Sequence, residues 1–248
     1  MIDKSIIFKI IGSLLFIEAL LLLACLFMAI GYQEDDVPAF IITIILTTLT
    51  GIVLRYLGRN ADNNMSRRDA YLVVTLSWII FSFFGTLPFI ISGYIPSFTD
   101  AYFETMSGFT TTGATIIDDV DKLPHGLLFW RSMTQWIGGL GIVFFTTAVL
   151  PSFVGGSVKV FAAESTGPIS SRLHPRLSTG AKWIWVVYLV LTIGCVLSFM
   201  ACGMGWFDSI NYAMGSTATG GFSTHTDSAE FFRSPAIEYV ATFFCFFS

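Results

Sequence analysis

The chain has 248 residues and a formal net charge of −4; 54% of its residues are hydrophobic and only 12% are charged. Soluble domains carry about 25% charged residues, so this composition excludes an ordinary soluble protein and predicts an all-α integral membrane protein. The acidic balance gives no basis for binding nucleic acid. No cluster of His, Asp, Cys or Ser stands at membrane depth, so an enzyme is not expected. The four cysteines lie in apolar runs without metal-ligand spacing, which is typical of small packing residues.

Hydropathy predicts six membrane-spanning helices, because about 20 apolar residues are needed to cross a bilayer. They are expected at residues 6–31, 38–57, 70–94, 126–150, 181–203 and from 235 onward. The first run lacks a small-residue cleavage site, which favours a retained helix over a signal peptide. The last run is still apolar at Ser248, so we expect the chain to be part of a longer protein.

Basic residues are distributed unequally between the two ends of these helices. Of the thirteen Lys and Arg residues, all but Lys122, Arg131 and Arg233 lie before residue 10 or in residues 55–69 and 159–182. Because basic loops stay in the cytoplasm, the N-terminus is expected to be cytoplasmic. The opposite, outer side holds Glu34, Asp35, Asp36, Asp100, Glu104, Asp118, Asp119, Asp121, Asp208, Asp227, Glu230 and Glu238. These acids either concentrate cations at an outer mouth or simply form a solvated face.

A short polar pattern occurs twice between apolar runs. It reads Asp-x5-Met, two or three residues, then Thr-x-Thr-Gly; it begins at Asp100 and Asp208 and ends in residues 110–113 and 217–220. Glycine adopts backbone angles closed to other residues, and non-helical backbone at membrane depth is tolerated where it lines a water or ion path. Carbonyl oxygens can replace the hydration shell of an alkali cation, and the C-terminal dipole of a short Asp-capped helix favours a cation. The pattern predicts two cation-selective filter loops; ordinary polar loops are the alternative.

The repeat divides the chain into four parts. Residues 69–150 read as helix, pore helix, filter loop and helix, and residues 181–248 read the same but are incomplete at the C-terminus. Residues 1–68 are predicted to form a peripheral pair of transmembrane helices outside both repeats. Residues 151–180 are predicted to form a cytoplasmic linker.

Three polar residues lie within predicted spans. Glu18 is an isolated acid in the first helix, and it is either functional or packed against a polar neighbour or protonated. Arg131 and Gln135 lie one turn apart near the outer end of the 126–150 helix. Arg131 either braces carbonyls of the filter or extends its charge to the interface.

The same helix contains a cluster of Gly138, Gly139 and Gly141. Small residues in membrane helices usually allow close helix packing, and a hinge is the alternative. Three histidines are scattered in loops, and we expect each to be a surface residue outside any metal or catalytic set. They are His125, His174 and His225.

Three stretches of this sequence resemble the Trk/Ktr/HKT superfamily of potassium transporters, in particular the membrane subunit of bacterial Trk systems. They are residues 106–115 (MSGFTTTGAT), 130–142 (WRSMTQWIGGLGI) and 213–224 (AMGSTATGGFST). The resemblance implies a potassium-channel-like fold in which four repeats surround one pore. Only two repeats stand here, without the third and fourth filter segments or the gating loop of the third repeat. The remaining pore repeats or a second copy are therefore expected to complete the pore.

The resemblance also implies which residues contact the ion and what else takes part. The implied filter residues are Thr110, Thr111, Thr112, Gly113, Thr217, Ala218, Thr219 and Gly220. The implied function is K⁺ uptake across the bacterial inner membrane, with Rb⁺ also passing. A homodimer and a cytosolic nucleotide-binding regulatory subunit of the TrkA type are implied partners. The alternatives are a symporter that couples K⁺ to H⁺ or Na⁺, for which Glu18 is the plain candidate, and a non-conducting half-pore.

Overall fold

The structure is a computed structural model, which describes residues 4–61, 67–149 and 177–247. Throughout these residues the regular elements are helices, with no strand, which confirms the predicted all-α fold. The predicted linker at 151–180 lies outside the described residues except for its last few positions. The elements are α1 (Lys4–Tyr32), α2 (Val37–Leu57), α3 (Arg67–Ile91), α4 (Phe98–Phe109), η1 (Val120–Lys122), α5 (His125–Val149), α7 (Leu177–Ala201), α8 (Trp206–Thr217), η2 (Ser228–Phe232) and α9 (Pro235–Phe247).

Four helices in the described part of the chain are long and apolar enough to cross a membrane. These are α1, α2, the Tyr71–Ile91 part of α3 and the Trp183–Ala201 part of α7, and α9 is a shorter apolar helix. The expected span at 126–150 corresponds to α5, but Gly141 has φ 67° and ψ 144°, which is not helical. The helix expected there is therefore interrupted at Gly141, because glycine allows the backbone to leave the helix at that point.

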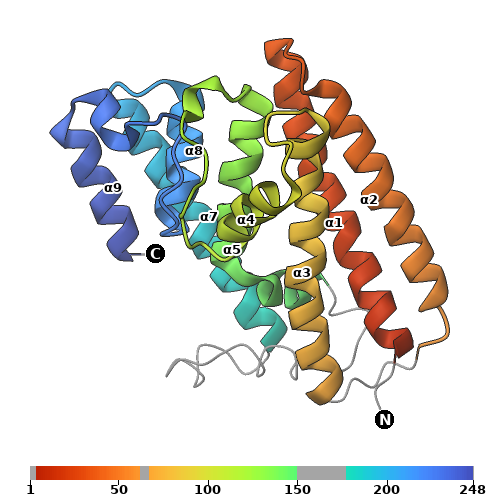
Figure 1. Cartoon of the computed structure of the whole chain (residues 1–248). Coiled ribbons are helices and arrows are strands. Elements are labelled where there is room, and N and C mark those ends of the chain that lie inside the picture. Colours follow the sequence, from red (N-terminus) through yellow and green to blue (C-terminus); the bar gives the residue numbers. More distant parts are fainter. Residues whose placement is uncertain (1–3, 62–66, 150–176, 248) are drawn as a thin grey trace.

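The helices repeat in the order long, short, long. Figure 1 shows α3, α4 and α5 followed along the chain by α7, α8 and α9, with α5 in the middle of the molecule. The short helices α4 and α8 have 12 residues each. Helix α5 packs against both of them. The central helix of the first repeat therefore supports the short helices of both repeats.

The start of each short helix differs from the expected Asp cap. In α4 the N-cap is Ser97, whose hydroxyl accepts a hydrogen bond from the backbone N–H of Asp100 at 3.5 Å. In α8 the N-cap is Gly205, and Asp208 lies in the first turn. Both acids stand one turn further inside than expected. They still lie near the positive end of the helix dipole, where a carboxylate is favourable.

Helices α1 and α2 form an antiparallel pair at one edge of the molecule (Figure 1). Gly12 and Gly51 lie at their contact: a Cβ added at Gly12 would be 2.8 Å from the carbonyl oxygen of Gly51, and one added at Gly51 would be 3.1 Å from that of Gly12. The first distance excludes a Cβ at Gly12, and the second would make a Cβ at Gly51 a tighter contact than is usual. Small residues thus let the two backbones approach closely, as in other membrane helix pairs.

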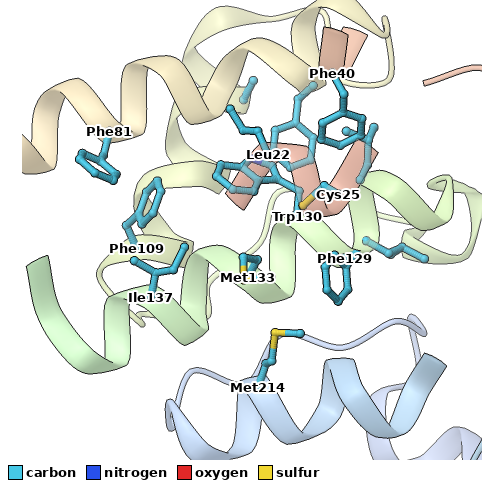
Figure 2. Packing of buried hydrophobic residues seen from close by; sticks show 14 of the residues in the cluster. Leu22, Cys25, Phe40, Phe81, Phe109, Phe129, Trp130, Met133, Ile137 and Met214 are labelled. Carbon is cyan, nitrogen blue, oxygen red and sulfur yellow. The ribbon is translucent and has the colours of Figure 1, made fainter. Parts of the chain in front are cut away.

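The largest apolar cluster joins α1 and α2 to α3, α4 and α5. Figure 2 shows Trp130 of α5 beside Leu22 of α1, and Phe109 at the end of α4 beside Ile137 of α5. Trp130 is fully buried, and its Nε1 donates a hydrogen bond to the carbonyl oxygen of Gly85 at 2.8 Å. This packing fixes the C-terminal end of α4, from which the first polar loop leaves. Cys25 and Cys195 are buried, as expected of packing residues, whereas Cys202 is partly exposed and Cys245 is exposed.

Candidate functional site

The two polar loops have the same backbone conformation. After α4, Thr110 has φ −81° and Thr111 has φ 52°, and after α8, Ala218 has φ −82° and Thr219 has φ 53°. Two residues further on, the backbone again has positive φ in both loops. These positions are Gly113 (75°) and Gly221 (84°). Residues 110–114 are called the first loop below, and residues 218–222 the second loop.

The hydrogen bonds at the ends of α4 and α8 match in the same way. The N–H of Thr110 donates to Met106 O at 2.9 Å, and that of Ala218 donates to Met214 O at 3.0 Å. Two residues later, the N–H of Thr112 donates to Ser107 O, and that of Gly220 donates to Gly215 O, both at 2.9 Å. The two loops are therefore equivalent residue by residue, from α4 and α8 onward.

This equivalence shifts the sequence alignment of the two motifs by one residue. Matching the letters Thr-x-Thr-Gly pairs Gly113 with Gly220, whereas the backbone pairs Gly113 with Gly221 and Thr112 with Gly220. The second loop has two adjacent glycines, and only the later one has positive φ. Gly221, and not the Gly220 that the motif letters indicated, is the conformational counterpart of Gly113.

Positive and negative φ values alternate along each loop, which turns successive carbonyl groups toward similar directions. Within the described residues, the carbonyl oxygens of residues 110–113 and 218–221 accept no hydrogen bond. Beyond them the backbone turns back. The Ala114 carbonyl accepts a hydrogen bond from the Ser107 hydroxyl at 2.6 Å, and the Phe222 carbonyl packs on Gly215. Each loop thus presents a short run of unpaired carbonyl oxygens.

The two loops lie against each other. A Cβ added at Gly113 would overlap the carbonyl oxygen of Gly220, and Gly113 also has positive φ. Two independent constraints, backbone conformation and space, therefore require glycine at 113. The implied filter residues of both repeats come together at this contact.

A buried ion pair contacts the segments that follow the two loops. Arg131 Nε donates to Glu104 Oε1 at 2.6 Å, and the two side chains are 3% and 0% exposed. Arg131 Nη1 also donates to the carbonyl oxygen of Ser223 at 2.9 Å. Glu104 in turn accepts hydrogen bonds from the N–H of Ile116 and the hydroxyl of Thr115. Arg131 therefore braces the chain that follows both loops and does not extend to the interface, and Glu104 does not belong to the exposed outer acids.

Gln135 lies one turn beyond Arg131 on α5. It is fully buried, and its Oε1 accepts a hydrogen bond from the N–H of Phe222 at 3.0 Å. Its amide occupies the space beside Gly220, because a Cβ there would lie 2.6 Å from both Nε2 and Oε1. The sequence placed Arg131 and Gln135 one turn apart but gave no signal that both reach the second repeat.

The glycine cluster of α5 serves close packing at two of its three positions. A Cβ at Gly138 would overlap the backbone of Phe109, and one at Gly139 would lie 2.9 Å from the Cα of Ala218. These glycines bring α5 against the C-terminal ends of both short helices, which confirms the packing interpretation. Gly141 instead interrupts the helix.

Two of the histidines form contacts with acidic residues of other segments. His225 Nδ1 lies 2.7 Å from Asp121 Oδ1, and its Nε2 lies 3.5 Å from Asp208 Oδ1. Hydrogen bonds from His225 and from the N–H of Thr226 lower the pKa of Asp121 to about 2. His125 is paired with Glu34 and stacked on the Tyr32 ring. The side chains of His125 and His225 are 36% and 20% exposed, and each is paired with a carboxylate; His174 lies outside the described residues.

Other kinds of site find little support in the described part of the chain. No group of three or more His, Cys, Asp or Glu residues there could hold a metal ion. Glu18 is fully buried in α1, and neither of its carboxylate oxygens has a hydrogen-bond partner among the described residues. The paired loops are therefore the candidate functional site, and Glu18 is a separate buried acid.

Comparison with known proteins agrees with this geometry. The family model described as "TrkH: Cation transport protein" matches residues 36–248. The Trk system potassium uptake protein TrkH of Halomonas elongata is 37% identical over 244 residues, which cover 98% of this chain and 51% of that relative. TrkH of Escherichia coli strain K12 is 37% identical over 222 residues, covering 89% of this chain and 46% of that relative.

A solved structure shares the fold as well as the sequence. The crystal structure of the potassium transporter TrkH from Vibrio parahaemolyticus matches with a TM-score of 0.81 and 36% identity, over 98% of this chain and 49% of that one. The chain thus spans about half the length of the curated relatives it matches. Because the family model covers most of the chain, the chain belongs to the TrkH family of cation transport proteins.

Proposed function

We propose that this chain supplies two segments of a selectivity filter through which K⁺ is taken up across a bacterial inner membrane. One observation carries the proposal: two equivalent loops lie in contact, each with alternating φ and a run of unpaired carbonyl oxygens. Neutral carbonyl oxygens are suited to replace the water around an alkali cation. The relatives with known names are potassium uptake proteins, which supports K⁺ as the transported ion.

Each loop follows the C-terminal end of a short helix. The last carbonyls of α4 and α8 carry a partial negative charge, which favours a cation over an anion. Rb⁺ should pass much as K⁺ does, because the two ions are similar in size. Residues 110–113 and 218–221 would provide the contacts, with Gly221 added to the set that the sequence motif indicated.

Two loops cannot surround an ion, so further filter segments must come from elsewhere in the assembly. We infer that these are the remaining pore repeats of a longer protein or those of a second copy. In this arrangement residues 1–68 are a peripheral helix pair, and the repeats extend over 69–150 and 181–248. The N-terminus is cytoplasmic, and a homodimer binds a cytosolic nucleotide-binding regulatory subunit of the TrkA type, which controls channel-like passage.

The test is the Gly113→Ser variant, assayed by uptake of radioactive Rb⁺ into liposomes in competition with K⁺ or Na⁺. A side chain at 113 would collide with the Gly220 carbonyl and strain the backbone. We expect the preference for K⁺ over Na⁺ to fall while Gly194→Ala keeps it, since a Cβ at Gly194 makes only ordinary contacts, the nearest at 3.6 Å. An unchanged preference in Gly113→Ser would contradict the proposal.

A coupled symporter is a second candidate, and Glu18 is the observation that favours it. A buried carboxyl without a hydrogen-bond partner in a membrane helix is a candidate for binding a proton. Its helix packs chiefly on α2, outside both repeats, so we rank this function second. Loss of pH-dependent uptake in Glu18→Gln would support it, and retained pH dependence would exclude a role for this acid.

A further inference from the structure

The peptide group between Gly221 and Phe222 is hydrogen-bonded to a side chain of the first repeat. The N–H of Phe222 donates to Gln135 Oε1 at 3.0 Å. No described peptide bond is cis, and in a trans peptide the N–H and C=O groups point in opposite directions. The Gly221 carbonyl is therefore directed away from Gln135. Gly221 itself is exposed, and an added Cβ there would meet no atom within 4 Å, so the space beside this residue is open.

The other end of the Gln135 amide lies where the two loops meet. Its Nε2 is 3.8 Å from the place of a Cβ on Gly113 and 2.6 Å from that of one on Gly220. The atom is buried and has no hydrogen-bond partner among the described residues. Burying an amide with an unused donor is unfavourable. An apolar residue of the same length would avoid that cost, so packing alone does not explain glutamine here.

The first loop has no such support. The residue equivalent to Phe222 is Ala114, and among the described residues its N–H has no side-chain acceptor. The first repeat therefore orients a carbonyl of the second loop from α5, while its own loop is held by Gly113 and by the bond between Ser107 and Ala114. The two loops differ in how they are fixed, although their backbones match.

We propose that Gln135 is a positioning residue that sets the direction of the Gly221 carbonyl and thereby the ion preference of the filter. The inference rests on the proposed function of the loops. Gln135 acts through a single acceptor atom, Oε1, so its effect depends on that atom and not on the volume of the side chain.

The experiment compares variants that keep or remove this acceptor, each purified and reconstituted into liposomes. Gln135→Met removes the oxygen at nearly equal length. Gln135→Glu retains an oxygen in its place, and burial at this position is expected to keep its carboxyl protonated and uncharged. Met133→Leu is the matched control, because Met133 lies on the same helix as Gln135 and belongs to the largest apolar cluster (Figure 2). Two quantities are measured: how strongly K⁺ and Na⁺ each compete with the uptake of radioactive Rb⁺, which gives the preference for K⁺, and the maximal rate of uptake.

We expect Gln135→Met to lose about tenfold of the K⁺ preference, as is typical when one hydrogen bond is lost, and Gln135→Glu and Met133→Leu to stay within about threefold of the parent. If Gln135→Met is not recovered as folded protein, Gln135→Leu takes its place, since it also lacks the acceptor. An acceptor-free variant with the parent's preference would overturn the proposal, as would a Gln135→Glu variant as impaired as Gln135→Met. A parent protein without K⁺ preference would instead contradict the proposed function.

Discussion

Arg131 Nε lies 2.6 Å from Glu104 Oε1, and both side chains are buried. Removing one partner of a buried ion pair leaves an uncompensated charge, which costs about 3–5 kcal/mol. We expect Arg131→Met to lower the thermal unfolding midpoint in detergent strongly. The double variant Arg131→Met/Glu104→Leu should lose much less than the sum of the two single variants.

The exposed ion pair between Lys122 and Asp119 provides the control. Its side chains are 80% and 43% exposed, so Asp119→Asn should change stability by less than about 1 kcal/mol. Additive losses for the Arg131 and Glu104 variants would show that the two side chains do not act as a pair.

The adjacent glycines of the second loop should respond differently to alanine. At Gly221 the cost is conformational, about 1–2 kcal/mol, because φ is 84° while the surrounding space is open. At Gly220 the cost is steric, because an added Cβ overlaps the Gln135 amide. We therefore expect Gln135→Ala to offset part of the loss in Gly220→Ala but none in Gly221→Ala. Thermal unfolding of the three single variants and the two double variants measures this, and equal rescue at both positions would rule out the structural pairing.

Close packing of α5 on the end of α4 depends on Gly138. An alanine there would overlap the Phe109 backbone, which cannot move as a flexible side chain can. Gly138→Ala should therefore destabilise the protein by about 1–3 kcal/mol. Gly194→Ala, in α7, should be neutral or slightly stabilising because alanine favours helix. A neutral Gly138→Ala would mean that the two helices do not touch at this point.

The pairing of Asp121 with His225 predicts that the stability of the protein depends on pH in the acidic range. The pKa of Asp121 is lowered to about 2, below its unfolded value of about 3.9, so the stabilisation is present above pH 4 and is lost as the pH falls toward 2. Because Asp121 is 46% exposed, the effect should stay under about 1 kcal/mol and shrink in high salt. In Asp121→Asn the thermal unfolding midpoint should change less between pH 2 and 4 than it does in the parent protein. An equal change in Asp118→Asn, in the same segment, would contradict this origin.

Sequence periodicity and composition were enough to predict the helical membrane fold and the repeat. Long apolar runs mark α1, α2, α3 and α7, and the two motifs mark the ends of α4 and α8. The motif letters nevertheless misaligned the loops by one residue. Positive φ in the first loop falls on Thr111 as well as on Gly113, so glycine letters alone do not report the backbone conformation.

Contacts between the repeats were beyond the sequence. A buried arginine needs a partner, and Glu104 in the preceding short helix α4 is an acid that could have been proposed for Arg131. Nothing in the residue spacing, however, connects Gln135 with Phe222, which is 87 residues away. The interruption of α5 at Gly141 was equally hidden, because a glycine cluster allows either packing or a break. These features arise from how the two repeats are placed beside each other.

The central claim is that these loops are segments of a K⁺-selective filter. The most direct measurement is the reversal potential of the membrane-reconstituted assembly that contains this chain and the remaining filter segments, with K⁺ on one side and Na⁺ on the other. The account predicts a potential close to the K⁺ equilibrium value, shifted toward zero in Gly113→Ser. Equal permeability to K⁺ and Na⁺ in the unmodified protein, or the absence of any cation current, would contradict it.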